Sequence, residues 1–289
     1  MRLRPKSCPR PPSLVTASYP ELKPDRALES AVLNALDPRN RTLKGGAHFN
    51  CGTGQITRTF GTWPSGDWQG IDPHAELMAR AKAALFGSQN FSMDSILRGG
   101  NSNALRTHPL RTDYHFRNEP LHRTSIRAQS VDRVVVEIGH RGEVDYRALV
   151  DEIRRIAIPG ATVIFVVYDV LRIDEWALDD VLYPQLLLLR HRMRRSQRAL
   201  ELFGLREVGR GKKLYATGCF DLPQVMRHID EGPECQRLSR GWDWTATGYL
   251  FRPLRRDWGR PAIKRNVRRR AYVWVGKVPA APTEPQEQP

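Results

Sequence analysis

Apolar residues along this chain fall into two patterns, which predict helices and buried strands in alternation. Between residues 28 and 36 they recur at helical spacing and stop before Asp37 and Pro38, which predicts a short amphipathic helix. Unbroken runs rich in β-branched residues at Val131–Ile138 and Thr162–Val167 are typical of strands buried on both faces of a parallel sheet. The alternation predicts an α/β fold.

Other segments extend the same pattern. A strand is expected at about 45–50 and a helix over 75–85, and residues 178–203 mix leucines with arginines as a long basic helix would. Asp221 stands two residues before a proline, which predicts a helix N-terminus. Residues 271–276 alternate in polarity and predict one more strand near the C-terminus.

The two ends of the chain are expected to lie outside this fold. Residues 1–24 are rich in proline and basic residues and cannot bury a core, so they are predicted to form a flexible leader. Residues 279–289 are predicted to be a disordered tail. One domain is expected over residues 25–278, with a core in about 25–170 and a cap with C-terminal strands in about 171–278.

The charge of the chain favours an anionic partner. The chain has 289 residues, 40% of them hydrophobic, which is enough material for a core. Its 46 Lys and Arg residues exceed its 31 Asp and Glu residues, so the formal net charge is +15. Such a charge attracts acidic metabolites, acidic lipids or nucleic acid even without specific contacts. A merely basic, arginine-rich surface is the alternative explanation.

The cysteines indicate a reducing compartment. Cys8, Cys51, Cys219 and Cys235 stand far apart and lack the spacing of a zinc site or a disulfide framework. The longest apolar run is too short to span a bilayer. We therefore expect a cytoplasmic protein with neither a structural metal nor a membrane partner.

A glycine turn followed by an acid is the most specific motif of the chain. Residues 46–54 end in Cys-Gly-Thr-Gly after a short apolar run, and the acid Asp72 follows the next predicted strand. Gly52 and Gly54 would let the backbone approach a ligand closely, and Asp72 would accept hydrogen bonds from ribose hydroxyl groups. The spacing therefore predicts a nucleoside-binding pocket.

These residues give the chain its resemblance to a known family. The glycine turn, the segment Gly-Ile-Asp-Pro-His-Ala at 70–75, the strand at 130–136 and the Pro-Gly-Ala turn at 159–161 resemble class I S-adenosylmethionine-dependent methyltransferases. The resemblance is in particular to the small-molecule branch related to trans-aconitate methyltransferases. Three residues depart from the family pattern: His48 replaces an acid, and Asn50 and Ala161 each replace a glycine.

The resemblance implies a fold and a cofactor. The fold would be a Rossmann-like, mostly parallel seven-stranded sheet with helices on both faces, an antiparallel edge strand at 271–276 and helical cap elements. The cofactor would be S-adenosylmethionine. Because His48 is not an acid, one electrostatic partner of the cationic cofactor would be missing.

The resemblance also implies site residues. The adenine ring would lie near Asn118 and Glu119, and His140, at the end of the fourth family strand, would be the catalytic base. The remaining cofactor contacts would come from the glycine turn and the end of the next strand: Asn50, Cys51, Gly52, Gly54, Asp72 and Pro73.

Three functions are compatible with these features. The first is methylation of an oxygen or carboxylate of a small, acidic molecule. The second is a methyltransferase-like protein that binds or regulates without catalysis. The third is a methyltransferase that acts on RNA or protein through its basic helix. Nucleic acid is the less favoured partner because no RNA-binding module is recognisable.

Overall fold

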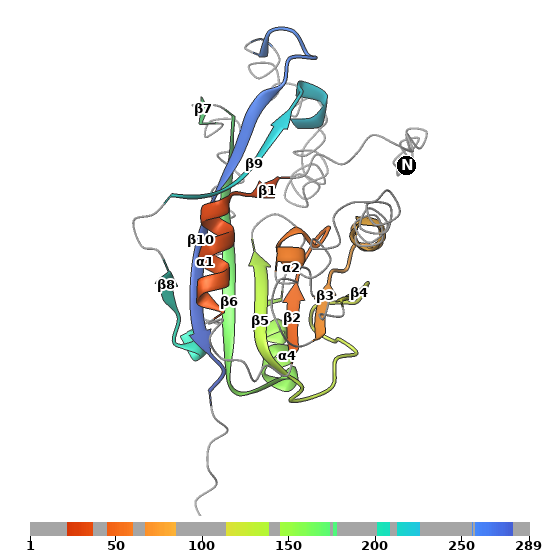
Figure 1. The fold of residues 1–289 in the computed structure, drawn as a ribbon, viewed down its shortest axis with the longest axis vertical. Helices are drawn as coiled ribbons and strands as arrows, with labels where there is room; N and C mark the ends of the chain where they lie inside the picture. Colours follow the sequence, from red (N-terminus) through yellow and green to blue (C-terminus); the bar gives the residue numbers. More distant parts are fainter. Residues whose placement is uncertain are drawn as a thin grey trace, which may run out of the picture.

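A single mixed β-sheet forms the framework of the computed structural model (Figure 1). The structure describes residues 22–36, 45–59, 67–84, 114–138, 145–173, 176–177, 201–208, 213–225, 256 and 258–279. Within these ranges the sheet has ten strands, more than the expected seven.

The strands are β1 (Lys23–Pro24), β2 (Gly45–Phe49), β3 (Asp67–Ile71), β4 (Tyr114–Arg117), β5 (Val131–Ile138), β6 (Ala157–Ile173), β7 (Trp176–Ala177), β8 (Arg206–Val208), β9 (Leu214–Phe220) and β10 (Arg265–Lys277). The helices are α1 (Arg26–Ala35), α2 (Gln55–Thr59), α4 (Tyr146–Ile156) and the 3-10 turn η3 (Glu201–Phe203). A further helix covers 75–84, and residues 222–225 form a helical turn.

Five neighbouring strands of this sheet run parallel. The strand order is β1-β9-β10-β6-β5-β2-β3-β4, with β7 beside β6 and β8 beside β10. All pairs from β6 to β4 are parallel, whereas every pair that involves β10, β9 or β7 is antiparallel. The sheet is thus mixed, and its parallel part contains the strands expected at about 45–50, 131–138 and 162–167, whereas β4 had not been expected.

The expectation of an antiparallel edge strand at 271–276 was wrong in one respect. The strand is antiparallel, but it lies inside the sheet, between β6 on one side and β9 and β8 on the other. The strand also begins earlier than expected, at Arg265, and the arginines at 268–270 pair with β9. These arginines interrupt the alternation of apolar and polar residues, so the sequence did not indicate this part of the strand. β9, which pairs with β10 on the side away from β6, had not been expected.

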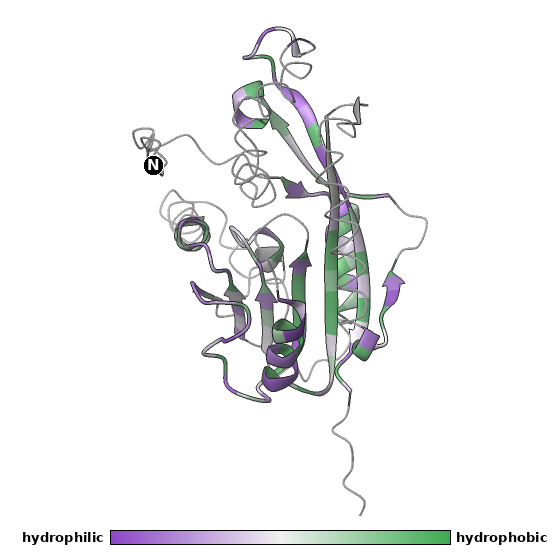
Figure 2. Ribbon diagram, turned by 180° about the vertical axis from the view of Figure 1, so that it is seen from behind, coloured by the Kyte–Doolittle hydropathy of each residue, from purple (hydrophilic) through white to green (hydrophobic). Residues whose placement is uncertain are grey.

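Helices cover both faces of the sheet, as expected. On one face, Leu28 and Val32 of α1 and Ile56 of α2 lie in one apolar cluster with Val135 of β5. On the other face, α4 packs against the flanking positions Val134 and Val136 of β5 and against Val163 and Phe165 of β6. Successive residues of β5 therefore serve opposite faces, and Figure 2 shows this central region as hydrophobic.

Acidic residues fix the start of both long helices. The Asp25 side chain accepts a 2.7 Å hydrogen bond from the backbone N–H of Leu28 and caps α1. Asp145 caps α4 through the N–H groups of Arg147 and Ala148. Asp221 likewise accepts from the N–H of Gln224, which confirms the expected N-terminus there.

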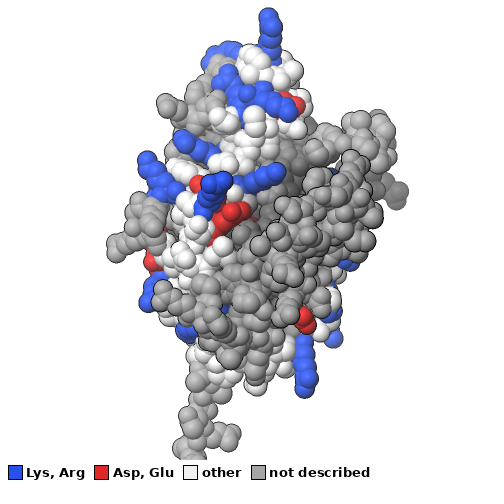
Figure 3. Space-filling view, viewed as in Figure 1, with Lys and Arg blue, Asp and Glu red and all other residues white. Residues whose placement is uncertain are grey.

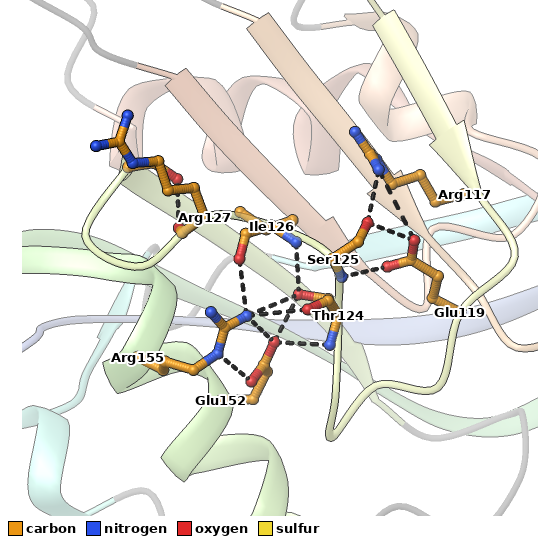
Figure 4. A network of polar contacts seen from close by, with 9 residues as sticks. Arg117, Glu119, Thr124, Ser125, Ile126, Arg127, Glu152 and Arg155 are labelled. Atoms are coloured by element: carbon orange, nitrogen blue, oxygen red, sulfur yellow. Dashed lines mark hydrogen bonds and ion pairs between the residues drawn. The ribbon is translucent and has the colours of Figure 1, made fainter.

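An ion pair between the buried Glu152 and the exposed Arg155 holds the segment that returns from β4 to β5 (Figure 4). Glu152 of α4 accepts hydrogen bonds from the N–H and hydroxyl of Thr124 and from the guanidinium of Arg155. Burial by itself would raise the pKa of Glu152, but these hydrogen bonds outweigh it and hold the pKa below the ordinary glutamate value. Arg155 also donates to the carbonyls of Thr124 and Ile126.

Some expected elements lie outside the described residues. These are the leader up to residue 21, residues 178–200 of the basic helix, the cap elements there and the tail beyond 279. The division into leader, domain and tail stays a prediction. Lys23 and Pro24 pair with β9 and so belong to the sheet. Among the described residues, no helix is long and apolar enough to cross a membrane.

Candidate functional site

The strand order creates a topological switch point between β2 and β5. From β2 the chain continues to β3 and β4 on one side of it, while β5 and β6 lie on the other side. Connections that diverge from two adjacent parallel strands leave a crevice at their carboxyl ends, which is where open α/β sheets bind ligands. Asn50, Asp72 and Asn118 directly follow the last residues of β2, β3 and β4. Sequence-predicted site residues thus meet at this edge.

The turn after β2 has a backbone that favours glycine. Gly52 and Gly54 have φ values of 59° and 73°, in the left-handed region. At Gly54 a Cβ atom would lie only 2.5 Å from Cζ of Phe116, so both the conformation and the packing exclude a side chain. The turn is closed by a 2.8 Å hydrogen bond from the N–H of Gly54 to the carbonyl of Cys51.

Asn50 also adopts a left-handed conformation, with φ at 55°. Asparagine tolerates this region better than most residues, which explains how it replaces glycine here. Its Nδ2 donates a 3.0 Å hydrogen bond to the carbonyl oxygen of Glu137, near the end of β5. The side chain therefore joins the two strands that border the switch point.

Asp72 is fully buried and fixes the glycine turn. Its Oδ2 accepts a 3.0 Å hydrogen bond from the N–H of Gly52, and its Oδ1 accepts from the N–H of His74 at 2.9 Å. Nδ1 of His74 also lies 2.9 Å from Oδ1. Asn118 donates from Nδ2 to the Asp72 carbonyl at 3.0 Å. Asp72 thus links the ends of β2, β3 and β4.

A buried histidine and glutamate lie beneath this turn, and the sequence had not indicated their contact. Nε2 of His48 lies 3.1 Å from Oε1 of Glu137, and the other ring nitrogen lies 2.6 Å from the Thr57 hydroxyl oxygen. His48 is fully buried, and the Glu137 side chain is 10% exposed. The acid near the end of an apolar strand was the one available signal.

Three further predicted residues lie at or near this turn, in different surroundings. The Cys51 side chain packs with Met78, Ala81 and Phe116, so only its backbone is available at the turn. The carboxylate of Glu119 accepts from the N–H and hydroxyl of Ser125 (Figure 4). Pro73 is exposed beside Asp72.

His140, the expected catalytic base, lies outside the described residues. Within the ranges that are described, no group of three or more His, Cys, Asp or Glu residues could hold a metal ion.

No protein-family model matches the chain, and no curated protein matches it. A protein assigned as a type II methyltransferase from Anaeromyxobacter dehalogenans has a similar structure, with 19% identity and a TM-score of 0.54 over 90% of this chain and 99% of that chain. A protein from Bacillus halodurans assigned as a methyltransferase is 11% identical, with a TM-score of 0.50 over 88% of this chain and all of that one.

A third structure is phosphoethanolamine N-methyltransferase 2 from Haemonchus contortus in complex with S-adenosyl-L-methionine. It is 13% identical and has a TM-score of 0.46, covering 89% of this chain and 54% of that one. The first two structures establish that this chain has the methyltransferase fold.

Proposed function

We propose that this protein is an S-adenosylmethionine-dependent methyltransferase. The observation that carries the proposal is the buried hydrogen bond from the N–H of Gly52 to Asp72, at the switch point of a methyltransferase fold. It places a glycine turn and an acid side by side at the edge where such sheets bind nucleosides. The residues that would hold the cofactor are Asn50, Gly52, Gly54, Asp72 and Asn118, with Cys51 contributing backbone and Pro73 and Glu119 flanking them.

Glu137 can take the place of the acidic residue that is missing at position 48. The Glu137 carboxylate contacts His48 from the neighbouring strand, so a negative group stands at the switch point although position 48 carries none. A carboxylate near a cationic ligand lowers the free energy of the bound state, most strongly where water is excluded. Glu137 is therefore the proposed electrostatic partner of the cofactor.

The cofactor supplies an electrophilic methyl group. The transfer is an in-line displacement, so the protein acts chiefly by aligning the two reactants, and it needs a base only where the acceptor carries a proton. We propose His140 as that base, because in the sequence it stands two residues after the last residue of β5, Ile138. The proposed acceptor is an oxygen or carboxylate of a small acidic molecule. The proposed enzyme is of the trans-aconitate methyltransferase type and acts in the cytoplasm.

One observation favours a second function. The Asp72 carboxylate already accepts hydrogen bonds from the N–H groups of Gly52 and His74 of the protein itself, as expected if the fold were kept for binding or regulation without catalysis.

Transfer of label from methyl-tritiated S-adenosylmethionine to fractions of a cell extract distinguishes these functions. We expect label in the small-molecule fraction, at a rate that falls in the His140→Ala variant. Label in RNA or protein would redirect the assignment, and no label despite cofactor binding would establish the non-catalytic function.

A further inference from the structure

The sheet continues past the proposed cofactor site as a projection. Ile138, the last residue of β5, pairs with Val167 of β6, but β6 runs on to Ile173. There it pairs with the N-terminal half of β10, which pairs with β9 on its other side. We call β9, residues 168–173 and residues 265–271 the arm. Figure 1 shows it extending beyond the carboxyl end of β5, on the side of the switch point.

Two arginines of the arm share one face. Arg268 and Arg270 are two positions apart on β10, so their side chains leave the sheet on the same side. Arg269, between them, pairs with Leu171, four residues past Val167, which is about 13 Å beyond the end of β5. The arginines therefore stand on the same edge of the sheet as the proposed cofactor site.

Each of these guanidinium groups lies against a tyrosine ring. Cζ of Arg268 is 5.3 Å from the ring centroid of Tyr215 on β9, and Cζ of Arg270 is 5.0 Å from that of Tyr272. All four side chains are half-buried. Contact with an aromatic face restricts a guanidinium while leaving N–H groups at its edge for a further partner.

The positive charges of this pair have no acidic partner among the described residues. Within the described part of the chain, neither Arg268 nor Arg270 forms an ion pair, and both Nε atoms are buried without a hydrogen-bond partner. Partial burial removes hydration from a cation, and a second cation two positions away adds repulsion. An anion bound at the outer N–H groups would relieve both effects. Figure 3 shows blue Lys and Arg side chains gathered over the upper part of the molecule.

We propose that Arg268 and Arg270 form a binding site for a phosphate group of a small molecule. Two planar donor groups suit the several oxygens of a phosphate, which accepts paired hydrogen bonds from arginine. Two guanidinium charges match one or two phosphate groups, whereas a nucleic-acid backbone requires a longer series of contacts. Under the proposed function, on which this step rests, the ligand is a phosphate-bearing methyl acceptor. The anion site itself does not depend on catalysis.

Calorimetric titration of the full chain with inorganic pyrophosphate at about 0.15 M ionic strength, where the Debye length is about 8 Å, tests the site. We expect the double variant Arg268→Gln/Arg270→Gln to bind pyrophosphate at least about tenfold more weakly, as for the loss of charge-assisted hydrogen bonds. The matched control is Arg260→Gln/Lys264→Gln, which removes the same charge from exposed positions just before β10. It should change affinity less than about twofold, because distant exposed charges are screened.

The charge-conserving variant Arg268→Lys/Arg270→Lys keeps the site testable if glutamine disturbs the arm. It should bind pyrophosphate more weakly than the natural protein but more tightly than the glutamine variant, because lysine lacks the planar donor group. Equal affinity in all variants, or an equal loss in the control, would overturn the proposal. A parallel titration with S-adenosylhomocysteine separates the two proposals. Absence of pyrophosphate binding alone would contradict the anion site, and absence of S-adenosylhomocysteine binding alone would contradict the proposed function.

Nucleic acid is tested with a labelled single-stranded RNA. We expect weak retention that the glutamine variant barely changes. Tight RNA binding that declines steeply with salt and disappears in that variant would replace the small phosphate ligand with a nucleic-acid backbone.

Discussion

Nε2 of His48 lies 3.1 Å from Oε1 of Glu137, and this contact joins the two strands that border the switch point. Because the imidazole also contacts Thr57 of α2, it connects β2, β5 and the helix that follows the glycine turn. Buried polar groups are tolerated when they find such partners. The pair is therefore expected to stabilise the turn in the folded protein.

A double-mutant cycle tests this contact. His48→Gln and Glu137→Gln should each lower the free energy of unfolding, and the double variant should lose less than the sum of both. Residues in direct contact show coupling energies of about 0.5–3 kcal/mol. Urea unfolding of the four proteins gives the value. Additive losses would mean that the two side chains do not support each other.

The stability of the protein should depend on which small residue replaces Asn50. Asn50→Ala removes the hydrogen bond to Glu137 and places an alanine at a φ of 55°, whereas Asn50→Gly removes only the hydrogen bond. The alanine variant should therefore be less stable than the glycine variant by about 1 kcal/mol, the usual penalty for a left-handed residue with a Cβ atom. Thermal unfolding measures the difference. Equal stability would argue against the left-handed conformation.

Glu152 should make the free energy of unfolding depend on pH in the acidic range. Its pKa is held below the ordinary value in the folded state, so the folded protein binds a proton less readily than the unfolded chain. This contribution is fully present above the pKa of an ordinary glutamate and is lost as the pH falls through the folded-state value. Glu152→Gln should weaken this part of the acid dependence of the unfolding free energy. The adjacent exposed residue supplies the control, Asp151→Asn, which should leave the dependence unchanged.

The sequence predicted the two central strands of the parallel part, 131–138 and 162–167, because burial on both faces leaves a clear apolar run. The helix ending near Leu36 was found from apolar residues at helical spacing, whereas β4 is too short and too polar to give either signal. The arm was missed because its strands are half-exposed, so that arginines and polar residues interrupt the alternation. β10 was consequently expected as a short edge strand, although it continues through the arginines at 268–270.

The glycine turn and Asp72 were identifiable for a different reason. Positive φ values and close packing restrict a position to glycine or asparagine whatever the rest of the chain does. The contact between His48 and Glu137 could not be predicted. It depends on the register of two strands whose nearest ends, Phe49 and Val131, are 82 residues apart in the sequence.

The most direct test of the proposed function is calorimetric titration of the protein with S-adenosylhomocysteine. We expect binding by the natural chain and a loss of about 1–3 kcal/mol in Asp72→Asn, since a buried charged hydrogen bond to the Gly52 N–H is weakened. Asp67→Asn, at the exposed start of the same strand, should bind as the natural chain does. Absence of binding by the natural chain, or equal affinity of all three proteins, would contradict a cofactor site organised by Asp72.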